Sequence, residues 1–320
     1  MTALAALILC FQVTVVPDSP TETSWPMAGK ANRPDGTVLK LVAVRVERRW
    51  DPTVERFREF LSPGSRLTRS AEVGGASWQC KLKNGPTGVY DVTVHEGEKR
   101  VHSERMLLGS PSPLLASTRR SLAKLLEACD RAGTYAEELQ QILAGKQPGT
   151  AAAREAFIKR VHADEQYLQE LAGRTDLTAS IFLLNDLLAQ IRNAQVWELP
   201  AGTKDEELND GKVGDRDVFL DPKLTFTSLK AQIAGVKTTL SRELSLSMAT
   251  ILDRIFARVP ERLLHKAKDA ASEAMKILEQ APVEDKEAKA AIDAATKAEP
   301  SGVAEIRKGL QDLMAKHLAQ

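Results

Sequence analysis

The hydrophobic period of the chain changes near residues 110–117, and this change constrains the fold more than any other feature of the sequence. Before it, apolar and polar residues alternate, as at Val42, Val44 and Val46, which is the period of a half-buried β-strand. After it, apolar residues recur every three or four positions, the period of an amphipathic α-helix. The sequence therefore predicts a segregated α+β protein, with a β-rich segment followed by a helical region.

The β-rich segment, residues 37–110, is predicted to contain short antiparallel strands. Residues 77–83 and 88–95 alternate, and a turn then leads into a partner strand. The pattern Gly-x-Tyr-x-Val-x-Val that begins at Gly88 resembles a closing strand of small immunoglobulin-like sandwiches. This resemblance implies a β-sandwich-like module. The small number of strands equally allows a partial sandwich or a small barrel.

Two stretches of the N-terminal third have no clear strand pattern. Residues 17–36 are rich in Pro, Ser, Thr and Gly and are interpreted as a linker. Residues 51–61 favour a short helix, because Asp51 fits an N-cap, Pro52 fits the first helical position, and apolar residues follow at helical spacing.

The helical region, residues 111–320, is predicted to form a mostly antiparallel α-helical bundle, because its helices have short connections. An acidic loop, residues 201–222, divides it. The Ala-rich residues 288–320 carry few bulky side chains, and we hypothesise that they pack weakly or dock elsewhere. The expected helices cover residues 117–143, 151–171, 176–196 and 226–259, a segment after Pro260 and a last apolar segment over 303–313.

An apolar run at the N-terminus points to export. Residues 3–16 are almost continuously apolar, a length typical of a signal peptide and too short to span a bilayer. We therefore expect residues 1–16 to be a signal peptide, the protein to be secreted or to lie in the periplasm or cell envelope, and no stable transmembrane span. No Lys or Arg precedes the run, and a buried first β-strand is the alternative.

The charge balance argues against a nucleic-acid partner. The chain has 44 basic and 43 acidic residues and 5% aromatic residues. Residues 1–110 hold 15 basic and 12 acidic residues, which leaves 29 and 31 in the remainder, so neither half has the basic surplus that is usual in nucleic-acid binders. The amphipathic helices are instead a candidate surface for a protein partner.

Cysteines and histidines do not form a recognisable metal site. Cys80 and Cys129 are both expected on apolar faces, which favours unpaired core thiols over a disulfide between the two parts of the chain, although the pairing stays open. His95 and His102 flank a predicted hairpin and are interpreted as a surface pair rather than as metal ligands.

Motifs that carry catalysis are absent from the sequence. It has no His-Glu-x-x-His, no Gly-x-Ser-x-Gly, no phosphate-binding loop and no dinucleotide fingerprint. We therefore predict no catalytic, cofactor-binding or metal-binding residues and no cofactor. The acidic loop resembles a calcium ligand set only in composition, because its spacing does not fit an EF-hand, and a solvated connector is preferred.

These observations favour an exported protein of the cell envelope that acts as a non-enzymatic binding or scaffold module. Two alternatives stay open. One is an enzyme whose active site is dispersed at the junction of the β-rich and helical parts. The other is a cytosolic assembly protein whose apolar N-terminus is a core strand.

Overall fold

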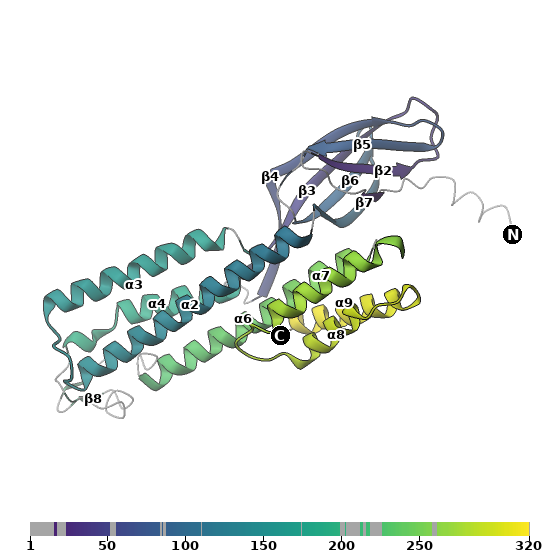
Figure 1. The fold of residues 1–320 in the computed structure, drawn as a ribbon. Helices are drawn as coiled ribbons and strands as arrows, with labels where there is room; N and C mark the ends of the chain where they lie inside the picture. Colours follow the sequence, from purple (N-terminus) through teal and green to yellow (C-terminus); the bar gives the residue numbers. More distant parts are fainter. Residues whose placement is uncertain are drawn as a thin grey trace.

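A computed structural model shows two β-sheets followed by a series of helices (Figure 1). The first helix begins at Pro111, where the hydrophobic period changes, so the predicted α+β organisation is confirmed. Residues 1–15 and most of the acidic loop lie outside the described residues. The residues described are 16–17, 24–51, 56–83, 85, 88–109, 111–173, 175–198, 202, 212–213, 216–217, 226–257 and 261–319.

The two sheets are antiparallel throughout. One has the strand order β1-β2-β5 and the other β4-β3-β6-β7. A short hairpin of β8 and β9 lies apart from them, in the loop between the helices. The strands are β1 Val16–Pro17, β2 Ser24–Lys30, β3 Val38–Asp51, β4 Arg56–Glu72, β5 Ser77–Lys83, β6 Gly88–Glu96, β7 Lys99–Leu108, β8 Lys212–Val213 and β9 Arg216–Asp217.

The predicted short helix over residues 51–61 is wrong, because Asp51 belongs to β3 and residues 56–61 belong to β4. The ladder between these strands continues to the pair Asp51 and Arg56, well past the last residue of β3 that pairs with β6, which is Arg45. The cross-strand hydrogen bonds of this ladder outweigh a local helix signal of only three turns.

The linker interpretation of residues 17–36 is also corrected by the structure. Ser24–Lys30 forms β2, which pairs along its whole length with β5. Trp25 and Met27 are two residues apart and both buried, so this strand has the alternating pattern of the others within a Pro-rich stretch.

The two sheets share one hydrophobic core. Trp25 of the first sheet meets Tyr90 of the second edge to face, with 5.5 Å between ring centroids. Tyr90, Val92 and Val94 of β6 are all buried, as expected for one face of a strand whose apolar residues alternate with polar ones. Trp78 and Leu82 of β5 complete the facing wall of this core.

The helical region follows the predicted pattern closely. The expected helices over 117–143, 151–171, 176–196 and 226–259 are all present, with ends shifted by a few residues. Short 3-10 turns cover Gln195–Glu198, Glu261–Leu263 and Pro300–Gly302. The α-helices are α2 Pro111–Leu143, α3 Ala151–Ala172, α4 Thr178–Arg192, α6 Phe226–Phe256, α7 Leu264–Leu278, α8 Lys286–Thr296 and α9 Val303–Ala319.

The C-terminal residues pack into the same core as the other helices, so the hypothesis that residues 288–320 pack weakly is wrong. Helix α9 lies along α6, and α8 contacts both α7 and α9. Ala288, Ile292 and Leu310 are fully buried in the core that extends from Leu115 to Leu313. Small alanine side chains let these helices approach closely, which offsets their lack of bulk.

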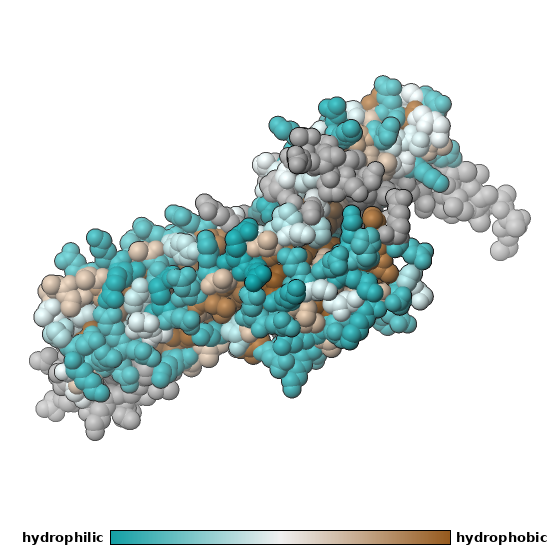
Figure 2. All heavy atoms as spheres, in the orientation of Figure 1, coloured by the Kyte–Doolittle hydropathy of each residue, from teal (hydrophilic) through white to brown (hydrophobic). Residues whose placement is uncertain are grey.

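Polar side chains cover most of the visible face of the helical region, and apolar residues gather in a band between the helices (Figure 2). Within the part of the chain that the structure describes, no helix is long and apolar enough to cross a membrane. The second sheet meets the helices through β3, which lies against α4, and through β7, which lies against α6.

Candidate functional site between the sheet and the helices

A cavity lies where the second sheet meets the helical region. The cavity has a volume of about 60 Å³, which is room for about four water molecules. Leu246 and Ile251 of α6 provide part of its apolar wall. The charged side chains that line it are Arg45 of β3, Glu59 of β4, Arg105 of β7, Asp176 before α4, and Glu243 and Arg254 of α6.

Glu243 joins α6 to the start of α4. It is only 3% exposed, and its carboxylate accepts hydrogen bonds from the backbone amides of Ala179 (2.7 Å) and Ser180 (2.8 Å) and from the Ser180 hydroxyl. Helix α4 begins at Thr178, and its N-cap residue Leu177 makes no side-chain capping bond. Glu243 therefore caps α4 from another helix and places a carboxylate at the positive end of the helix dipole.

The environment of Glu243 perturbs its acidity. Burial raises the pKa of its carboxyl to about 7, while the hydrogen bonds from Ser180 and Ala179 and the positive charge of Arg242 oppose this rise. A carboxyl with this pKa exchanges its proton near neutral pH, which is the range useful for general acid–base chemistry.

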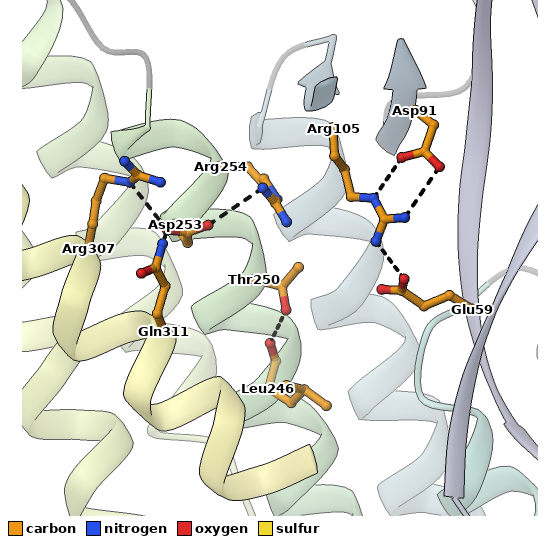
Figure 3. A network of polar contacts seen from close by, with 9 residues as sticks. All are labelled: Glu59, Asp91, Arg105, Leu246, Thr250, Asp253, Arg254, Arg307 and Gln311. Atoms are coloured by element: carbon orange, nitrogen blue, oxygen red, sulfur yellow. Dashed lines mark hydrogen bonds and ion pairs between the residues drawn. The ribbon is translucent and has the colours of Figure 1, made fainter. Parts of the chain in front are cut away.

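Arg105 is held in an ion-pair network on the sheet side of the cavity (Figure 3). Its Nε and Nη2 donate to the two carboxylate oxygens of Asp91, at 2.7 and 3.3 Å, and its Nη1 donates to Glu59. Asp91 and Arg105 stand directly opposite each other on β6 and β7. These carboxylates raise the pKa of Arg105 above its usual value, and together they neutralise its charge.

Arg45 and Arg254 have much weaker partners. The nearest carboxylates described are Glu47, 4.0 Å from Nη1 of Arg45, and Asp253, 3.8 Å from Nη1 of Arg254. The buried Nε of Arg254 has no hydrogen-bond acceptor among the described residues. The site thus contains two guanidinium groups that are only loosely paired.

Asp253 is occupied on its other side by α9. Its carboxylate accepts hydrogen bonds from Nε2 of Gln311 (3.0 Å) and Nε of Arg307 (3.3 Å), as Figure 3 shows. Asp253 is 2% exposed, so these contacts are what satisfies a buried charge. These contacts also orient the Asp253 carboxylate towards α9. Arg307 lies 3.3 Å from this carboxylate, whereas Arg254 lies 3.8 Å from it.

The cysteines and histidines singled out in the sequence lie away from this cavity. Cys80 and Cys129 are free thiols, as the sequence favoured, and burial raises the pKa of each to about 11. His95 contacts Thr93 and His102 contacts Glu104, each on its own strand, and the two histidines are not opposite each other in the ladder. No group of three metal-ligating side chains occurs in the described ranges.

The calcium hypothesis for the acidic loop falls almost entirely outside the described residues. The sequence does not predict the individual residues that form the cavity, and it offers the junction only as one possible place of a dispersed site. Comparison with known proteins gives no further guide, because no family model, curated protein or solved structure matches the chain.

Proposed function

We propose that this is an exported protein of the periplasm or cell envelope that acts as a non-enzymatic binding or scaffold module. In this proposal the β-rich part is an immunoglobulin-like sandwich and the helical part is a mostly antiparallel bundle. The apolar residues 3–16 support export, because they have the length of a signal-peptide core.

Strand order supports the immunoglobulin-like assignment. The sheet β4-β3-β6-β7 resembles the C′-C-F-G sheet of such sandwiches, and β1-β2-β5 resembles the opposite sheet. In these folds a tyrosine near the start of strand F directs its hydroxyl back to the backbone a few residues upstream. Tyr90 fits this position, since a Cβ built on Gly85 would lie 3.1 Å from its hydroxyl oxygen.

The observation that carries the proposal is the long helical extension beyond the sheets. Helices α2 and α6 have 33 and 31 residues, so each is on the order of 50 Å long at the rise of an α-helix. They extend with α3 and α4 away from the β-rich part (Figure 1). An elongated helical surface attached to a small β-rich head suits a protein that holds a partner at a distance.

Export is tested by N-terminal sequencing of the protein purified from native cells. The proposal expects a mature chain that lacks the apolar N-terminal run. An intact Met1 in all fractions would reject export and would favour the alternative of a cytosolic assembly protein.

Partner binding is tested by photocrosslinking in native cells. A crosslinker is placed at the exposed positions Ala163 and Gln169 of α3, and as matched controls at the exposed positions Thr68 and Ser70 of β4. The proposal expects a discrete crosslinked species from the α3 positions. Equal and diffuse crosslinking from all four positions would contradict a helical binding surface.

An enzyme with its active site at the β/α junction is a second candidate function. The observation that favours it is the buried carboxyl of Glu243, which titrates near neutral pH beside a cavity that also contains Arg45 and Arg254. In a screen of hydrolase and lyase substrates, this candidate expects an activity that Glu243→Gln abolishes while the fold is retained. An activity equal in both proteins would place the chemistry elsewhere.

A further inference from the structure

We infer that the junction cavity is a binding site for a small oxyanion, which Arg45 of β3 and Arg254 of α6 hold between the sheet and the helices. The ligand class is a carboxylate or phosphate group, either free or at the end of a small molecule. This inference goes beyond the proposed function and does not depend on it.

The pairing of charges around the cavity supports an anionic ligand. On the sheet side, Arg105 is matched by Asp91 and Glu59, so this network contributes no free positive charge. Among the residues that the structure describes, the nearest carboxylates lie 4.0 Å from Arg45 and 3.8 Å from Arg254, beyond hydrogen-bond distance. Guanidinium groups in such surroundings bind oxyanions through paired N–H donors.

Both arginines are positioned by the fold rather than mobile on its surface. Their side chains are 28% exposed for Arg45 and 24% exposed for Arg254. Gly88 of β6 makes room for Arg45, because a Cβ at this position would lie 3.0 Å from Nε of Arg45. The two cations come from different parts of the molecule, so an anion between them also joins the sheet to α6.

The remaining walls suit a small polar ligand. Space for about four waters is enough for a tetrahedral or planar oxyanion and too small for a larger organic molecule to enter completely. Ser247 of α6 is buried in the same wall and offers a hydroxyl donor. Leu246 and Ile251 are buried in the same wall, and apolar surroundings strengthen the electrostatic attraction.

The acidic residues of the cavity make this binding depend on pH. The carboxylates that face it are Glu59, which is paired with Arg105, the exposed Asp176, and the buried Glu243. When Glu243 is ionised it repels an anion, and when it is protonated the repulsion disappears. Because burial raises the pKa of Glu243 to about 7, affinity should rise as the pH falls from about 8 to about 6.

Isothermal titration calorimetry of the full chain tests the inference. Sulfate is the primary probe because its charge does not change between pH 6 and pH 8, and acetate and inorganic phosphate then distinguish a carboxylate from a phosphate preference. We expect saturable sulfate binding that Arg45→Gln and Arg254→Gln each weaken at least about tenfold, since each removes charge-assisted hydrogen bonds. The matched control is Arg66→Gln, an exposed arginine of β4, which should leave binding unchanged.

Two further variants keep the test valid if an arginine variant does not fold. Gly88→Ala should weaken sulfate binding by displacing Arg45, whereas Gly74→Ala, where an added Cβ meets no atom within 4 Å, should not. Glu243→Gln should make the affinity nearly independent of pH over this range. Absence of saturable binding, or equal binding by wild type and the folded Arg45→Gln/Arg254→Gln double variant, would overturn the inference.

Discussion

The Glu243 carboxylate accepts a hydrogen bond from the backbone amide of Ser180 at 2.8 Å, although the two residues are 63 positions apart in the chain. This bond and its neighbour from Ala179 satisfy backbone donors that the start of α4 would otherwise leave buried and unpaired. These hydrogen bonds give Glu243 a structural role in addition to its place in the lining of the cavity.

Removal of this cap should destabilise the protein. We expect Glu243→Ala to lower the free energy of unfolding by about 2 kcal/mol, because buried amides lose their acceptor, and Glu243→Gln to lower it by about half as much. Urea denaturation followed by circular dichroism measures both. Glu137→Ala, at an exposed position in α2, is the control and should change stability by less than about 0.5 kcal/mol. A loss no larger than that of the control would mean that water replaces the cap.

The raised pKa of Glu243 should give a measurable dependence of stability on pH. The folded state holds this proton up to about pH 7, whereas the unfolded chain releases it near the ordinary value of 4.5. The stabilisation is therefore complete below about pH 4.5 and is lost as the pH rises through about 7, by roughly 1–3 kcal/mol. Urea denaturation at several pH values between about 5 and 8 measures it, and the slope should be smaller in Glu243→Gln. Identical slopes in the two proteins would assign the effect to other groups.

Asp285 should contribute stability in the opposite pH direction. Its carboxylate accepts a hydrogen bond from the Ala288 amide at the start of α8, and His317 lies 2.8 Å away on α9. Burial opposes ionisation, but the amide and the imidazole prevail and lower the pKa of Asp285. This contribution is present above the ordinary carboxyl pKa and is lost as the pH falls through the lowered value.

The corresponding substitution is Asp285→Ala, which removes both the helix cap and the contact with α9. We expect it to lower the free energy of unfolding by about 1–2 kcal/mol at neutral pH and by less in acid. Asp269→Ala, an exposed site on α7, serves as the control in the same thermal denaturation experiment. Equal effects of the two substitutions at neutral pH would contradict the role assigned to Asp285.

Contact between Gly85 and Tyr90 should make the β-rich part sensitive to one methyl group. A Cβ on Gly85 would lie 3.1 Å from the Tyr90 hydroxyl oxygen and 3.4 Å from Leu67, so the neighbours must move. We expect Gly85→Ala to cost about 1–3 kcal/mol, as overpacking against a buried side chain does. Gly74→Ala meets no atom within 4 Å and is the control in thermal denaturation. A Gly85→Ala variant as stable as Gly74→Ala would show that Tyr90 adjusts freely.

Much of the fold could be predicted because its elements carry clear periods. Helix α6 shows what the hydrophobic period predicts and what it leaves out. Its apolar stripe through Leu240, Leu244 and Met248 predicts a buried helix, which the structure confirms. A second row of residues follows the same helix at alternating spacings of four and three positions. Its first half is apolar and its second half is polar. Its members are Leu229, Ile233, Val236, Leu240, Glu243, Ser247, Thr250 and Arg254.

The polar half of this second row forms one wall of the cavity, so the sequence contains a signal for the helical side of the site. No sequence signal marks the cavity residues on the sheet side. Arg45 lies among alternating residues of a strand, where a polar residue normally faces solvent, whereas the structure places it opposite the buried Tyr90 of β6 and in the wall of the cavity. Strand β2 was missed for a similar reason, since its prolines suggest a linker while its pairing with β5 decides its conformation.

The position of α6 at the centre of the helical core has a consequence for biosynthesis. The β-rich part has a core of its own and can fold as soon as β7 has left the ribosome. Helix α6 contacts helices that precede it and also α7 and α9, which are made last. The ribosome must therefore release nearly the entire chain before this core closes. A message truncated ahead of Val303 would yield a finished head attached to helices in which Asp253 lacks both Arg307 and Gln311, a product that quality-control proteases should recognise.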